Sequence, residues 1–163
     1  MRMFSSVLAL ALIATAGVAY ATTAPSPSEF VTDAIKGDNA EIQMGKLAEE
    51  QGGSAAMKRF GRTLVADHTK AKSQMDRVAE EVGVKPTSDL PADADAEMKK
   101  LQGLKGAAFD KEFASHSVDD HQKDIDKFQA EAEAKNGPAS TIAAKQLPTL
   151  KKHLRMAQAL DKG

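Results

Sequence analysis

The chain of 163 residues contains no cysteine and no tryptophan, and it has one tyrosine and six phenylalanines. Without cysteine it can form neither a disulfide framework nor a cysteine-linked lipid anchor, and any metal site must use other ligands. Lys and Arg number 22 against 23 Asp and Glu, for a net charge of −1. This balance, with few aromatic rings for base stacking, argues against a nucleic-acid partner.

A hydrophobic run long enough to span a membrane is also lacking. The chain opens with a short basic start at Arg2, an apolar run over residues 7–14 and a small-residue site, Ala19-Tyr20-Ala21. This order predicts a Sec-type signal peptide over residues 1–21, because the apolar run is too short for a membrane span. We expect a disordered leader over residues 22–28 and one domain over residues 29–163. After signal cleavage, with no integral membrane segment left, the domain would be periplasmic or secreted.

Apolar residues recur at helical spacing through the rest of the chain, and no strand pattern competes with them. Periodicity and turn residues predict four long helices near residues 28–51, 54–82, 107–135 and 139–161, with Ser28 and Ser54 as N-caps. A short helix is expected near residues 95–104. The connections after the first and third long helices are short, and the one between the second and third is long. This connectivity is typical of ferritin-type bundles. We therefore predict an all-α, ferritin-like four-helix bundle whose long crossover carries a short extra helix.

Three of the four histidines lie at the centre of the apolar stripe of a different predicted helix. They are His68, His121 and His153, and Glu41 holds the equivalent place on the first helix. His121 precedes and His153 follows the turn at Gly137 by the same number of residues, so both lie roughly 24 Å from it. Glu41 and His68 differ by about one helical turn in their distance from the first turn, and a glutamate side chain can span much of that difference. The four groups are expected at one level of the bundle.

Burying one ionisable side chain is costly unless it is paired or ligated, and four on converging faces are hard to explain as packing. Three imidazoles and a carboxylate suit a single divalent transition metal such as Zn, Cu, Fe or Mn. Asp67 and Asp120 each directly precede a candidate ligand. They are candidates either for orienting an imidazole on a neighbouring helix or for surface ion pairs with Lys or Arg.

Short ordered motifs give a resemblance to a known family. They run from Phe30-Val31 to Ala40-Glu41-Ile42, from Phe60 to Asp67-His68-Thr69, from Gly106-Ala107-Ala108-Phe109-Asp110 to Asp120-His121, and from Pro148 to His153-Leu154. Over about residues 28–160 the chain resembles the bacterial family of unknown function numbered 4142. The resemblance implies a signal peptide, a ferritin-like bundle and a periplasmic location, and it supplies no activity.

The favoured hypothesis is a metal-binding protein with a single His₃/Glu site, acting in metal buffering or stress protection. One alternative is a mononuclear metal oxidoreductase acting on oxygen species, which needs an open coordination position. The other is a metal-free structural or interaction bundle with a buried polar network. A ferritin-style di-iron centre is disfavoured because its Glu-x-x-His motifs are absent. No catalytic residue and no protein partner are assigned.

Overall fold

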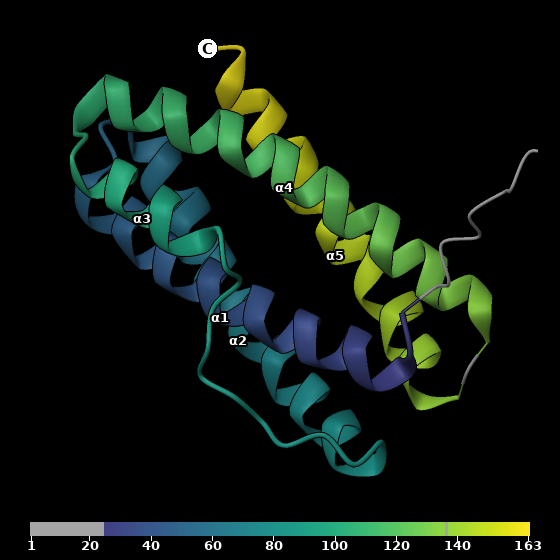
Figure 1. Ribbon diagram of the computed structural model, residues 1–163. Helices are drawn as coiled ribbons and strands as arrows, with labels where there is room; N and C mark the ends of the chain where they lie inside the picture. Colours follow the sequence, from purple (N-terminus) through teal and green to yellow (C-terminus); the bar gives the residue numbers. More distant parts are fainter. Residues whose placement is uncertain (1–24, 136) are drawn as a thin grey trace, which may run out of the picture.

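The computed structural model describes residues 25–135 and 137–163. In this part of the chain four long helices and one short helix form the fold (Figure 1). They are α1 (Pro27–Gln51), α2 (Ala55–Glu81), α3 (Ala94–Gln102), α4 (Gly106–Ala134) and α5 (Pro138–Asp161). The prediction of an all-α bundle with a short helix in the long crossover is confirmed.

The first helix begins with a capping box. The Ser26 hydroxyl accepts a hydrogen bond from the Glu29 N–H, and the Glu29 carboxylate accepts one from the Ser26 N–H, with Pro27 at the first helical position. The prediction of Ser28 as N-cap is therefore wrong, because Ser28 already lies inside α1. The expected signal peptide, residues 1–21, and residues 22–24 of the expected leader lie outside the described residues.

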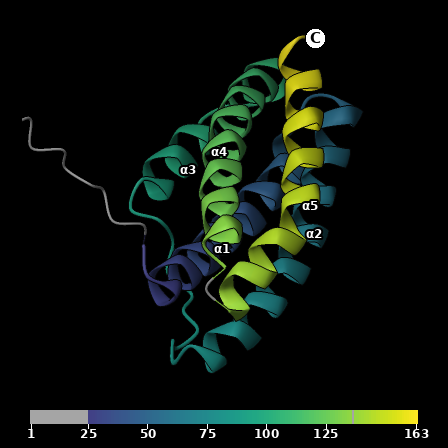
Figure 2. The same cartoon turned by 90° about the vertical axis from the view of Figure 1, so that its right-hand side faces the viewer.

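The long helices pack as two antiparallel pairs. α1 packs mainly against α2 and α4 mainly against α5, while α2 and α5 join the pairs. The crossover that carries α3 returns the chain along the bundle, so α2 and α4 run in the same direction (Figures 1 and 2). The first pair thus contributes one histidine-bearing helix, α2, which packs against α5, and the second pair contributes two, α4 and α5.

Side-chain hydrogen bonds fix both ends of the crossover. The Asn39 amide on α1 donates to the carbonyl oxygens of Thr87 and Asp89, 2.9 and 3.0 Å away. At the other end, the Asp110 carboxylate accepts from the N–H groups of Gly53 and Ser54, at 2.7 and 2.9 Å. These N–H groups precede the first turn of α2, where a carboxylate is favourable. The contacts tie the start of α4 to the α1–α2 turn.

The core consists of two apolar clusters separated by a polar layer. The first cluster contains Phe30, Val31, Ala34, Ile35, Met75, Val78, Ala79, Ile125, Phe128, Ala139, Ile142, Ala143 and Leu150. The second contains Ala40, Met44, Leu47, Ala48, Met57, Phe60, Leu64, Ala94, Leu101, Phe109, Phe113, Ala114 and Ala157. Along α2, α4 and α5 the clusters are separated by His68, His121 and His153, respectively. The polar layer is therefore enclosed by apolar side chains above and below.

The close packing of α1 on α2 depends on glycine. A Cβ added at Gly61 would lie 2.5 Å from the Gly45 carbonyl oxygen, and one at Gly45 would lie 2.9 Å from the Gly61 carbonyl oxygen. Gly37, also inside α1, has no atom within 4 Å of the position of an added Cβ. Glycine is thus sterically required at the first two positions and not at the third.

We expect Gly61→Ala to lower the free energy of unfolding by a net of about 1–2 kcal/mol, because overpacking outweighs the gain in helix propensity. Gly37→Ala, the matched control, should raise it by about 0.5–1 kcal/mol. Urea denaturation of the two variants beside the wild type measures both values. Equal stabilisation by the two substitutions would contradict the close helix contact.

Candidate metal centre

Three buried imidazoles meet in the polar layer, one each from α2, α4 and α5. His68, His121 and His153 are 4%, 1% and 0% exposed. Their ring centroids are 5.1 to 5.9 Å apart, and each ring offers one nitrogen that lies within 4.8 Å of the other two. Among the described residues, these three form the group of His, Asp or Glu side chains whose possible ligand atoms all lie this close to one another. The predicted convergence of the three histidines is present in the structure.

Fixed partners hold two of the rings in a defined tautomer. His121 Nδ1 donates to the Ser117 carbonyl oxygen at 2.9 Å, because a carbonyl can only accept. His153 Nε2 lies 2.9 Å from Asp67 Oδ2, which also accepts from Lys152 at 2.9 Å. Burial raises the pKa of Asp67, but the hydrogen bonds from His153 and Lys152 outweigh it and the net pKa is lowered. An ionised Asp67 requires the proton on His153 Nε2.

The third ring pairs with a residue that the sequence reasoning missed. His68 Nδ1 lies 2.8 Å from Oδ1 of Asp38, whose side chain on α1 is 8% exposed. Asp38 precedes Glu41 by three residues, so both lie on the inward stripe of α1. The sequence feature that could have indicated Asp38 as a partner of His68 was its position on that stripe.

The nitrogens that face one another have no partner. His68 Nε2, His121 Nε2 and His153 Nδ1 are buried and make no hydrogen bond with any described residue. Two of them, on His121 and His153, carry lone pairs, because the other nitrogen of each ring holds the proton. Buried acceptors without a donor are unfavourable. A cation placed among the three nitrogens would satisfy all of them.

Burial also keeps the rings uncharged. It lowers the pKa of His68 to about 4, that of His121 to about 3 and that of His153 to about 4. For His121 and His153, repulsion from the neighbouring rings lowers the pKa further. All three imidazoles are therefore neutral near pH 7. A neutral imidazole is the form that binds a metal ion.

Glu41 is not part of this group. It lies on α1 and is 3% exposed, but its carboxyl does not join the mutually close histidine nitrogens. It hydrogen-bonds instead to Asp120, and burial together with the Asp120 charge raises the pKa of Glu41 well above its usual value. Asp120 therefore contacts a carboxyl rather than an imidazole, whereas Asp67 does contact a histidine on a neighbouring helix.

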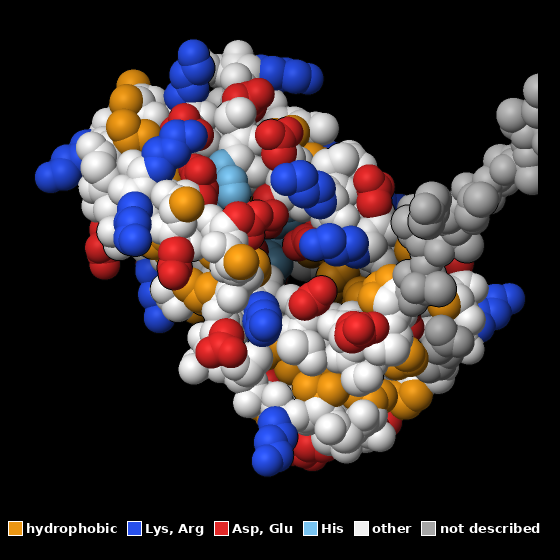
Figure 3. Space-filling model, viewed as in Figure 1, with side chains coloured by type: hydrophobic (Ala, Val, Ile, Leu, Met, Phe, Trp, Pro, Cys, Tyr) orange, Lys and Arg blue, Asp and Glu red, His pale blue; other side chains and the backbone are white. Residues whose placement is uncertain are grey.

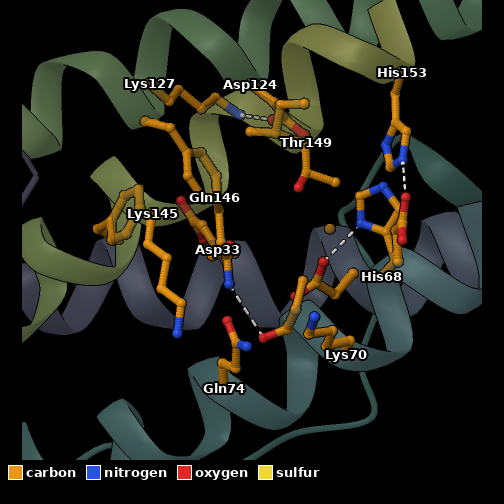
Figure 4. A pocket seen from close by; sticks show the side chains of 18 of the residues that line it. Asp33, His68, Lys70, Gln74, Asp124, Lys127, Lys145, Gln146, Thr149 and His153 are labelled. Atoms are coloured by element: carbon orange, nitrogen blue, oxygen red, sulfur yellow. Dashed lines mark hydrogen bonds and ion pairs between the residues drawn. The ribbon is translucent and has the colours of Figure 1, made fainter. Parts of the chain in front are cut away.

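A cavity of about 180 Å³ opens beside the centre and reaches His68 and His153. All four long helices contribute to its walls, and Figure 4 shows Thr149 and Gln146 beside the open space. On the surface, Figure 3 shows a hollow on this face of the molecule with acidic and basic side chains around it. The centre is thus separated from solvent on this side by a cavity rather than by a packed core.

The three nitrogens fit a transition-metal ion. A tetrahedral ion with metal–nitrogen bonds of about 2.0–2.1 Å holds its nitrogen ligands about 3.3 Å apart. The present upper separation of 4.8 Å requires only small side-chain shifts to reach that value. Each ring also has the second hydrogen bond, to a carboxylate or a backbone carbonyl, that metal-binding histidines ordinarily make.

Comparison with known proteins identifies the family. No curated protein and no solved structure matches the chain. A domain of unknown function, DUF4142, matches residues 13–160 and therefore covers nearly the whole chain, including the three histidines and their partners. The resemblance drawn from the short motifs is confirmed. The chain belongs to the DUF4142 family.

Proposed function

We propose that this protein binds one divalent transition-metal ion through His68 Nε2, His121 Nε2 and His153 Nδ1. The observation that carries the proposal is the convergence of three buried, unpartnered ring nitrogens, each on a ring whose other nitrogen is hydrogen-bonded. The proposed ligand set omits Glu41, because its carboxyl hydrogen-bonds to Asp120 outside the group. The negative charge that acts on His68 and His121 from this side is that of Asp120.

Neutral imidazole ligands suit Zn²⁺, Cu²⁺, Fe²⁺ and Mn²⁺, with intrinsic affinity highest for Cu²⁺ and lowest for Mn²⁺. Bridged di-iron sites use several carboxylates in direct contact with the ions. This centre offers three nitrogens instead, which favours a single ion. We therefore propose metal buffering or protection from metal stress in place of iron storage.

The two alternatives have weaker support. A metal-free polar network would satisfy its own members, yet the three facing nitrogens form no hydrogen bond to one another or to any other described residue. A mononuclear oxidoreductase needs a coordination position open to its substrate. Here the three donor atoms are themselves buried, and the cavity beside them reaches only the rings of His68 and His153. Binding of an ion is the simpler use of this geometry.

The proposed location is the periplasm or another compartment outside the cytoplasm. Its support is the signal-like order of a basic start, an apolar run and Ala19-Tyr20-Ala21. In the described part of the chain, no helix is both long enough and apolar enough to cross a bilayer. Sequencing the N-terminus of protein recovered from a periplasmic extract tests the location, with Thr22 as the expected first residue.

The metal proposal is tested by elemental analysis of protein purified without a histidine tag and dialysed against each of the four ions. We expect one ion per chain in the wild type and almost none in His121→Ala or His68→Ala. His116→Ala is the matched control, because His116 lies on the same helix as His121 but outside the group. Equal metal content in wild type and His121→Ala would refute the site.

A further inference from the structure

The cavity beside the centre is lined by a glycine that packing does not require. Gly37 lies in the middle of α1, where glycine destabilises a helix relative to alanine. Gly45 and Gly61 occupy such positions because their helices are in close contact, but an added Cβ at Gly37 would meet nothing within 4 Å. The effect of glycine at position 37 is to leave the cavity free of a side chain.

Charge in the cavity changes with depth. The carboxylates of Asp38, Asp67 and Asp124 are 8%, 31% and 22% exposed. The lysines that line the cavity, Lys70, Lys127 and Lys145, are exposed to solvent, and Figure 4 shows them around the open space. The inner part is therefore acidic, and the outer part is mixed.

Asp38 connects the cavity with the metal centre. It lines the cavity, and its Oδ1 contacts His68 Nδ1, so one carboxylate touches both the open space and a proposed ligand. Its other oxygen, Oδ2, is buried and has no partner among the described residues. Burial raises the pKa of Asp38 well above its usual value, and a cation beside Oδ2 would stabilise the ionised carboxylate.

We propose that this cavity is the route by which the metal ion reaches the three histidines, with Asp38 and Asp124 binding the ion on the way. The inference rests on the proposed metal site and adds an entry path to it. Oxygen ligands bind a hydrated cation first, and the softer imidazole nitrogens then retain it. The open position at Gly37 keeps the path wide enough for an ion and its remaining water.

The test is the rate at which metal-free protein takes up Co²⁺, a spectroscopic substitute for the ion, followed by its visible absorption after rapid mixing. Gly37→Leu projects a side chain into the cavity and should slow uptake about tenfold or more, within the range over which association rates vary among related variants. The final stoichiometry should remain one Co²⁺ per chain. Gly37→Ala, the matched control, adds only a methyl group and should load at nearly the wild-type rate.

Charge variants test the acidic groups separately. Above pH 7, Asp124→Asn should slow uptake several-fold and reduce its dependence on salt, because burial raises the pKa of Asp124 to about 7 and its ionised form attracts the incoming ion. Lys145→Gln removes a positive charge and should accelerate uptake. If Gly37→Leu loads as fast as the wild type, the cavity is not the route, and the histidine site stands. If wild-type protein takes up no Co²⁺ and none of the four ions above, the metal site itself is refuted.

Discussion

Saturation with its preferred ion is expected to raise the protein's free energy of unfolding by about 4 kcal/mol when free ion is present at a thousand times its dissociation constant. For a domain of this size, this corresponds to an increase in melting temperature of about 10 °C. The physical reason is that the three ligands come from helices far apart in sequence. Only the folded state brings them within 4.8 Å of one another.

Thermal unfolding followed by circular dichroism measures the effect, with chelator-treated protein compared against protein loaded with each ion. His121→Leu keeps a side chain of similar size in the layer between the apolar clusters but removes a ligand. It should fold and show no metal-dependent shift, while His116→Ala keeps the full shift. A melting temperature that is identical with chelator and with every ion would contradict the proposal.

A large part of this centre was predictable from helical geometry alone. His121 and His153 lie at equal distances from the turn at Gly137, so antiparallel α4 and α5 place them at one level. The apolar stripes then direct both rings inward, and His68 meets them from α2. The level of a residue along its helix follows from its distance in sequence to the turn, and the face on which it lies follows from the apolar periodicity. Both are local properties, so the sequence alone determines them.

The position of Glu41 outside the group of three histidines also has a geometric reason. Glu41 is about one turn nearer than His68 to the α1–α2 turn, and a long side chain was expected to close that gap. In the structure, Asp38, one turn earlier on the same stripe, lies at the level of His68 and contacts it. The boundary between the two apolar clusters on α1 also falls at Asp38, after Ile35 and before Ala40.

Contacts between helices could not be deduced in the same way. Whether Asp67 or Asp120 reaches an imidazole depends on how each helix is rotated against its neighbours. That rotation follows from the packing of the whole core rather than from one stripe. The structure gives the imidazole contact to Asp67, across the α2–α5 interface, and the Glu41 contact to Asp120, across the α1–α4 interface.

Asp67→Asn is expected to weaken metal affinity by about 10–100-fold, the usual cost of losing the carboxylate behind a histidine ligand. The ionised Asp67 keeps the proton of His153 on Nε2 and leaves the Nδ1 lone pair facing the centre. An asparagine can turn its amide and donate to Nε2, which moves the ring proton to Nδ1, where it blocks the ion. The packing of the ring is otherwise unchanged.

Competition with a chelating dye measures the affinity, and nitrogen-15 spectra of the metal-free protein report which ring nitrogen of His153 is protonated. Lys152→Gln is the matched control, because it removes the partly exposed ion pair with Asp67 and leaves the His153 contact in place. A half-exposed pair of this kind contributes little, so the control should bind metal almost as the wild type does. If both variants lost affinity equally, Asp67 would act through its charge alone. A loss confined to Asp67→Asn, with the proton shifted to Nδ1, assigns its effect to the tautomer of His153.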